Sequence, residues 1–307
     1  MIPLSDTTHS VPSTEPPTPS RHGGADGKDS AGRVVLMGQI LVDLAVRGEA
    51  LPTPGGDVWA IDEGMHVGGG FNTLVAARRM GAEAISLSPI GDGPYSSLIQ
   101  AALAREGITD LGPRIAGIDN GFCIAFTDRT GERTFISTKG AETMAPASAW
   151  ADFVRTMSPG DVLYIDGYLM DHPTNREAAE AALRVLPEGV RVLLDVSPVI
   201  GIPSTLPSND VIVSMNHREA QEIAQQRGDS SVCDRCREPH EAARAMLGLL
   251  GRPVVVRVGA EGAYFADPSA VATDACDEDA LHTPTPHVEA IDTNGAGDAH
   301  SGVLAAS

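Results

Sequence analysis

Short apolar segments alternate with helical segments along most of this chain, and this alternation limits the possible folds more than any other feature. The apolar segments predict strands at 33–38, 82–88, 162–166, 190–195, 211–215 and 254–258. Patterns with helical spacing occupy 73–80, 96–106, 175–186, 218–226 and 239–250. Apolar strands that alternate with helices build a parallel sheet that is covered on both faces. The sequence therefore predicts a doubly wound, mostly parallel α/β fold.

Two parts of the chain depart from this rhythm. Residues 122–127 and 132–138 flank the turn at 128–131 and predict a β-hairpin. This hairpin, within 121–140, would form a small sheet with parts of 44–67. Residues 1–31 are rich in Pro, Ser, Thr and Gly and lack apolar periodicity. Because they bury too little apolar surface to offset ordering entropy, we expect a disordered tail at 1–31 and one folded domain at 32–307.

The charge of the chain limits its partners. The 307 residues carry a formal net charge of -19, with a pI near 4.7, which argues against nucleic acids and anionic membranes. An acidic protein that binds a polyanion would use backbone N–H groups and a metal ion rather than a basic patch. The sequence shows no signal-peptide pattern and no apolar run near the roughly 18 residues of a membrane helix, so we expect a cytoplasmic protein.

Four cysteines, Cys123, Cys233, Cys236 and Cys276, do not indicate a disulfide framework in a chain of this length. Cys233 and Cys236 form a CxxC pair, which could be half of a zinc site or a redox pair. Neither a second pair nor an HxxxH motif stands nearby in the sequence. We therefore interpret 228–237 as a surface insertion, like the acidic stretch 273–280.

The segment from Asp292 to His300 carries the strongest indication of chemistry. Gly295 and Gly297, separated by Ala296, allow a tight turn in which successive N–H groups point one way. The helix predicted after them adds its positive dipole end, so the segment can hold an anion such as a phosphoryl group. Asp298, in the first turn of that helix, is placed to take a proton from a hydroxyl that attacks the phosphate. By itself the segment could equally be an ordinary glycine-rich turn.

Other polar segments have both a structural and a functional interpretation. The glycines of 68–70 let the backbone approach a ligand, and Asn72 would either cap the following helix or bind a ligand hydroxyl. Asn216 and Glu219 have the spacing of a helix cap, while Glu219 could also hold a hard cation through water. Arg257 would either pair with phosphates or point into solvent at a strand end.

These motifs, in this order from about Val34 to the end of the chain, resemble those of the ribokinase-like, phosphofructokinase-B type family of carbohydrate kinases. The resemblance implies that ATP, with Mg²⁺, phosphorylates a hydroxyl of a sugar or nucleoside. It implies that the small sheet forms a lid over the sugar. The roles it implies are substrate binding by Asp43, Gly69, Gly70 and Asn72, nucleotide contacts by Asn216, Arg257, Gly259 and Gly262, and metal binding by Glu219 and Asp292. It implies catalysis by Asp298, with the N–H groups of Gly295, Ala296 and Gly297 on the phosphate.

The resemblance also implies a monovalent cation, such as K⁺, near Asp292, and it allows a homodimer through the lid. It gives Asp195 a supporting role and makes His300 a packing variation. Relatives usually continue for several dozen residues beyond the position of Asp298, so we expect helices that complete the nucleotide pocket to be missing. Two alternatives to a sugar kinase stay open: a nucleoside kinase of the same fold, and a truncated, non-catalytic sugar-binding protein.

Overall fold

A sheet of nine strands forms the centre of the described chain, in the order β13-β12-β11-β10-β9-β8-β1-β4-β5. Neighbouring strands pair in parallel except where β12 pairs with β11 and β13 pairs with β12. The strands are β1 (Arg33–Met37), β4 (Glu83–Ser86), β5 (Thr109–Asp110), β8 (Val162–Asp166), β9 (Arg191–Asp195), β10 (Val211–Asn216), β11 (Val254–Arg257), β12 (Ala263–Ala266) and β13 (Leu281–Thr283). The predicted mostly parallel sheet is confirmed.

The computed structural model describes residues 32–207, 210–268, 280–288 and 293–307, which all belong to one unit of the chain. The predicted tail, Cys276, most of the acidic stretch and Asp292 lie outside the described residues.

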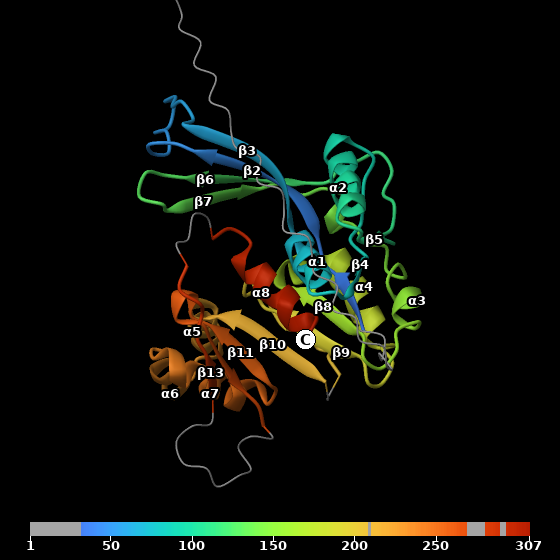
Figure 1. The fold of residues 1–307 in the computed structure, drawn as a ribbon, viewed down its shortest axis with the longest axis vertical. Helices are drawn as coiled ribbons and strands as arrows, with labels where there is room; N and C mark the ends of the chain where they lie inside the picture. Colours follow the sequence, from blue (N-terminus) through green and yellow to red (C-terminus); the bar gives the residue numbers. More distant parts are fainter. Residues whose placement is uncertain (1–31, 208–209, 269–279, 289–292) are drawn as a thin grey trace, which may run out of the picture. The chain divides into compact units, whose positions relative to one another are not determined.

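Helices cover both faces of the large sheet (Figure 1). They are α1 (Gly70–Arg79), α2 (Pro94–Arg105), α3 (Ala151–Val154), α4 (Pro173–Leu183), α5 (His217–Arg227), α6 (Ser230–Arg235), α7 (Pro239–Leu250) and α8 (Ala296–Ala305). Side chains of β1 point alternately to the two faces of the sheet, and both faces are apolar. Val34 and Leu36 pack in the core under α1, α2 and α8, whereas Val35 and Met37 pack in the core under α4, α5 and α7. The doubly wound arrangement is therefore confirmed.

A second sheet of four strands lies beside the large one, in the order β3-β2-β6-β7 (Figure 1). Its strands are β2 (Ile40–Arg47), β3 (Asp62–Gly69), β6 (Phe122–Thr127) and β7 (Arg133–Ser137). The hairpin of β6 and β7 occurs where the sequence predicts it. The other two strands are longer than predicted, since β2 begins three residues after β1 ends and β3 runs directly into α1.

The CxxC segment, interpreted as a surface insertion, is mostly exposed and is helical. Residues Ser230–Arg235 form the helix α6, in which Asp229 caps the N-terminus through hydrogen bonds from the N–H groups of Ser231 and Val232. Cys236 is fully buried against the core, and its carbonyl oxygen lies 2.8 Å from Nε2 of His217. Apolar burial of Cys236 and a local cap thus order a segment whose composition looked loop-like. Within the described parts of the chain, no helix has the length and apolar character needed to cross a membrane.

Candidate active site at the carboxyl ends of the strands

Four neighbouring strands of the large sheet end in a polar residue at the same edge. These residues are Asp166 in β8, Asp195 in β9, Asn216 in β10 and Arg257 in β11. The carboxyl ends of parallel strands are where α/β folds bind ligands, because the helices that follow them leave a crevice there. Two cavities open at this edge, and the N-terminus of α8 lies between them.

The turn before α8 has the geometry that the glycines predict. Gly295 caps the helix with φ 70° and ψ 5°, a left-handed conformation that favours glycine. A Cβ on Gly295 would lie 2.7 Å from Nδ2 of Asn72, so the turn is also pressed against α1. The N–H groups of Gly297 and Asp298 stand in the first turn of α8, where no intrahelical acceptor exists. The helix therefore presents donors and its positive dipole end to the cavities.

Asp298 lines both cavities and receives a hydrogen bond of 3.3 Å from Nδ2 of Asn72. The pKa of Asp298 is raised to about 6, mainly by burial and also by the nearby Asp195, while Asn72 and Arg257 oppose the rise. Because Asn72 is the third residue of α1 and Gly69 is the N-cap, the capping interpretation of Asn72 is wrong. Asn72 instead orients the carboxylate that both cavities share.

The smaller cavity has a volume of about 370 Å³ and brings together the residues predicted to bind substrate. Asp43, Gly69, Gly70 and Asn72 line it, together with Asp298. Asp43 precedes the segment 44–67 that we expected to contribute to the small sheet, but the structure places it within β2 of that sheet, from which it reaches the cavity. Its pKa is raised by burial, against a hydrogen bond from Asn294 and the attraction of His66.

Asp166 is a site residue that the sequence analysis missed. It lines the same cavity, and its two oxygens accept hydrogen bonds from the N–H groups of Gln39, at 3.1 Å, and Leu169, at 2.9 Å. Burial raises its pKa to about 7, and the negative charges of Asp298 and Asp195 add to that rise. The available signal was its position, because Asp166 ends a fully buried strand one place away from Asp195 in the sheet.

The larger cavity has a volume of about 1010 Å³ and combines a polar half with an apolar half. Asn216, Gly259 and Gly262 line it with the turn at 295–298, as predicted, and Val255, Phe265 and Val303 supply apolar surface. Gly262 has φ 107°, and a Cβ there would lie 2.0 Å from the carbonyl oxygen of Thr283. Only glycine therefore fits at this position.

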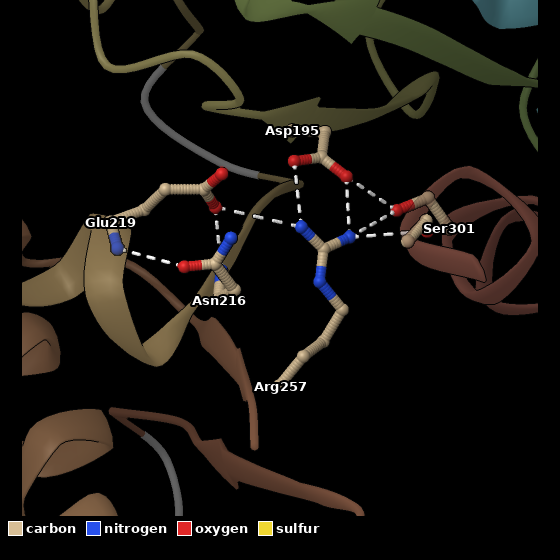
Figure 2. Close-up of polar contacts among 6 residues, drawn as sticks. Asp195, Asn216, Glu219, Arg257 and Ser301 are labelled. Carbon is tan, nitrogen blue, oxygen red and sulfur yellow. Dashed lines mark hydrogen bonds and ion pairs between the residues drawn. The ribbon is translucent and has the colours of Figure 1, made fainter. Parts of the chain in front are cut away.

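Arg257 does not point into solvent at the strand end; it lines the larger cavity and bonds several protein groups there (Figure 2). Its guanidinium bonds both oxygens of Asp195, with distances of 2.6 Å from Nη1 and 3.1 Å from Nη2. Nη1 also donates to the carbonyl oxygen of Gly297, at 3.2 Å, and to Oγ of Ser301, at 3.1 Å. The attraction of Asp195 and Glu219 outweighs desolvation and raises the pKa of Arg257. The side chain is bonded to the protein and also lines the larger cavity, so its role toward phosphates stays a prediction.

Asn216 and Glu219 form a capping box at the start of α5. Oδ1 of Asn216 accepts from the N–H of Glu219 at 2.8 Å, and Oε2 of Glu219 accepts from the N–H of Asn216 at 2.6 Å. The capping role does not exclude the predicted binding of a cation by Glu219, because its Oε1 is not part of the box. The described residues contain no group of three or more His, Cys, Asp or Glu side chains that could hold a metal.

Comparisons with known proteins agree with this arrangement. A family model described as pfkB family carbohydrate kinase matches residues 31–307. The chain is 31% identical over 275 residues to the uncharacterized sugar kinase YegV of Escherichia coli, which covers 88% of this chain and 79% of that protein. It is 23% identical over 285 residues to the ribokinase of Schizosaccharomyces pombe, covering 89% of this chain and 84% of the ribokinase.

The fold has close counterparts among solved structures. The ribokinase of Arabidopsis thaliana, determined in complex with ribose and ATP, superposes with a TM-score of 0.68 at 20% identity. The superposition covers 90% of this chain and 85% of that one. The predicted family and its ribokinase-like fold are thus confirmed: the chain belongs to the pfkB family of carbohydrate kinases.

Proposed function

We propose that this carbohydrate kinase transfers the γ-phosphate of ATP to a hydroxyl of a sugar, with Asp298 as the general base. One observation carries the proposal: two carboxylates of the described residues line both the smaller cavity and the larger, partly apolar one, and only Asp298 stands at the start of α8, since both oxygens of Asp195 are bonded by the Arg257 guanidinium. A group in that position can meet a sugar hydroxyl from one side and a phosphate from the other. With a pKa raised to about 6, Asp298 is mostly ionised at neutral pH and close to the range in which a general base is efficient.

The turn at 295–298 would hold the transferring phosphate. The transition state of phosphoryl transfer is loose and strongly charged, so fixed N–H donors that need no reorganisation supply much of the stabilisation. Donors at the start of α8 suit a chain of net charge -19, which must bind a polyanion without a basic patch. The apolar half of the larger cavity, around Val255, Phe265 and Val303, would receive the adenine ring.

Mg²⁺ fits this site as an ion bound mostly by phosphates and water. Mg²⁺ in nucleotide sites takes one or two carboxylates and keeps several waters, so the lack of a larger ligand cluster in the described chain is compatible with it. Glu219 would hold it through Oε1 or through a water, and the bound ion would neutralise phosphate charge. Asp292 and a K⁺ site near it stay predictions, because Asp292 lies outside the described residues.

The smaller cavity would bind a polyhydroxylated substrate. Carboxylates accept hydrogen bonds from hydroxyl groups, and Asp43 and Asp166 face the cavity from opposite sheets. The small sheet, which carries Asp43, would act as the lid. A nucleoside is the second candidate, because Tyr168 and Phe135 line this cavity and are 46% and 54% exposed. Such rings could stack on a base.

The outer face of the lid would join two copies of the chain. Met65, Leu44, Ile124 and Ile136 are paired in register across its four strands and so lie in one row. Met65 and Ile136 are 54% and 59% exposed, and a contiguous apolar row of this kind suits a self-complementary twofold contact. We expect Met65→Lys with Ile136→Lys to halve the particle mass in light scattering; a wild-type monomer would rule the dimer out. A cytoplasmic location, where ATP is available, remains our prediction.

The decisive experiment measures ADP release by the purified protein with MgATP across pentoses, hexoses and nucleosides. We expect turnover with a sugar, and a loss on the order of 10²–10⁴ in kcat for Asp298→Asn. A nucleoside as the best substrate would favour the second candidate. Near-normal turnover of Asp298→Asn would exclude Asp298 as the base. Binding of a sugar without any ADP release would instead support the non-catalytic alternative.

A further inference from the structure

The contacts around Arg257 have a consequence beyond charge balance. We propose that Arg257 and Asp195 are positioning residues that hold the first turn of α8, and with it Asp298 and the N–H donors, in the geometry for phosphoryl transfer. This inference rests on the proposed function of Asp298 and adds two residues that line the cavities and would act by holding α8 rather than by reacting.

A buried ion pair by itself is weak evidence for stability, because the cost of desolvation can exceed the attraction between the charges. The exposed fractions of the Arg257 and Asp195 side chains are only 11% and 3%. Apolar side chains of similar volume could join β9 to β11 at less cost. The retained pair is therefore better explained by what else the guanidinium binds.

The remaining donors of Arg257 reach two points of α8, one helical turn apart (Figure 2). Nη1 binds the carbonyl oxygen of Gly297, and Oγ of Ser301 both accepts from Nη1 and donates to Asp195 at 2.7 Å. On its other side, α8 packs so closely on α1 that a Cβ at Gly302 would lie 2.2 Å from the carbonyl oxygen of Thr73. The helix is thus fixed between α1 and the ends of β9 and β11.

The bond to Gly297 also acts on the anion-binding turn electronically. The carbonyl group of Gly297 and the N–H group of Asp298 belong to one peptide unit. A charged donor on the carbonyl polarises that unit and makes its N–H a stronger donor. The same guanidinium lies 3.6 Å from Oε2 of Glu219, so it also connects this turn to the carboxylate proposed to hold Mg²⁺.

The two charges of the pair also have opposite effects on the pKa of Asp298. Asp195 raises the pKa of Asp298 and Arg257 lowers it, in addition to the larger effect of burial. The titratable groups that act on Asp298 or are acted on by it are Asp43 from β2, Tyr164 and Asp166 from β8, Tyr168 after β8, Asp195 from β9 and Arg257 from β11. Removal of either partner should therefore move the acid limb of the kcat–pH profile, and in opposite directions.

The test compares Arg257→Met, Asp195→Asn and Ser301→Ala with the wild type in steady-state kinetics across pH. We expect Arg257→Met to lower kcat about 10- to 100-fold, with a smaller change in KM, because misplacement of about 1 Å costs that much. Its acid limb should move to higher pH, whereas that of Asp195→Asn should move to lower pH. Arg257→Lys keeps the charge but cannot form the fork, so it should recover the pH profile and only part of kcat.

The double variant Arg257→Met/Asp195→Leu removes both charges of the pair and leaves Glu219 its capping-box bond to Asn216, so it should fold even if the single variants do not. A double variant with wild-type kcat would overturn the inference, because the pair would then serve only to balance its own charges. The matched control is Arg33→Met with Asp161→Asn, a second Arg–Asp pair far from both cavities, which should keep kcat and its pH profile. If Asp298→Asn is inactive but Arg257→Met is unchanged, the base assignment stands and only the positioning role fails.

Discussion

The large sheet has an Arg–Asp ion pair at each end of its strands, and the two pairs differ in what else they bind. The end where the parallel strands begin is called the amino edge, and the end where they finish is called the carboxyl edge. At the amino edge, Arg33 at the start of β1 binds Asp161 just before β8 with its backbone N–H and its guanidinium. At the carboxyl edge, Arg257 binds Asp195 with a comparable fork. The spare donors differ: Nη2 of Arg33 bonds the carbonyl oxygen of Thr156, whereas Nη1 of Arg257 bonds the turn that bears Asp298.

The titration of the carboxylates follows the same division. Although burial alone would raise the pKa of Asp161, hydrogen bonds from Arg33 and Ser158 lower it below its ordinary value. At the carboxyl edge, burial dominates and raises the pKa of Asp166 and of Asp298. The hydrogen bonds of the amino edge thus favour the ionised carboxylate, while burial at the carboxyl edge disfavours it, as is typical of functional sites.

The largest effect on stability should come from Asp195→Asn. This change leaves the buried Arg257 guanidinium without its counter-charge, at a cost of about 3–5 kcal/mol in the free energy of unfolding. Asp161→Asn should cost only about 1–3 kcal/mol, because the Arg33 side chain is 26% exposed and can be hydrated. Urea denaturation of both variants measures the difference; equal losses would mean that the two edges do not differ in burial energetics.

A smaller effect, with opposite signs at the two edges, should appear when stability is followed against pH. The raised pKa of Asp298 means that the folded state favours its protonated form, so its contribution to stability is full below about 3.8 and is lost as the pH rises through about 6. Asp298→Asn should therefore match the wild type below pH 4 and exceed it above pH 7, by on the order of 1–3 kcal/mol.

The pKa of Asp161 is lowered, so this group stabilises the folded state at a pH above 3.8, the ordinary pKa of Asp. That stabilisation is lost as the pH falls below 3.8. Asp161→Asn should accordingly destabilise the protein at pH 7 and approach the wild type in acid. Thermal unfolding from pH 3 to 8 checks both variants. A pH-independent difference for Asp298→Asn would contradict a raised pKa for that group.

The smallest effects should come from two glycines, Gly302 in α8 and Gly160 at the amino edge. Gly160 has φ 95° with open space around its Cβ position, so Gly160→Ala should cost roughly 1–2 kcal/mol through backbone strain alone. Gly302→Ala should cost a similar amount through contact with Thr73, but it also displaces α8. We expect kcat to fall for Gly302→Ala only. Equal activities of the two variants would show that the position of α8 tolerates such shifts.

The sequence predicts the large sheet and the tight turn before α8 well, because both depend on local signals. Buried parallel strands are continuous apolar runs in the sequence. Gly295 adopts the left-handed conformation that glycine favours, so this turn can be recognised from the residues of the segment alone. The same holds for the capping box of Asn216 and Glu219, whose partners are three residues apart.

The sequence predicts the partners of buried charges poorly, because those partners are distant along the chain. Asp195 and Arg257 are separated by 62 positions, and nothing in the segment around Arg257 indicates that its side chain would turn inward. Asp43 was left outside the segment 44–67 assigned to the small sheet, since a strand that begins soon after β1 resembles a continuation of it. Further helices that complete the larger cavity stay a prediction.

The direct passage of β3 into α1 connects the small sheet mechanically to Asp298, the proposed base. Gly69 ends the strand and Gly70 begins the helix, so a tilt of the sheet turns the start of α1, where Asn72 holds the carboxylate of Asp298. A sugar that draws Asp43 inward would thereby adjust the base on the far side of the cavity. Futile hydrolysis of ATP would be suppressed by this coupling, because the base would reach its working orientation only when an acceptor is in place.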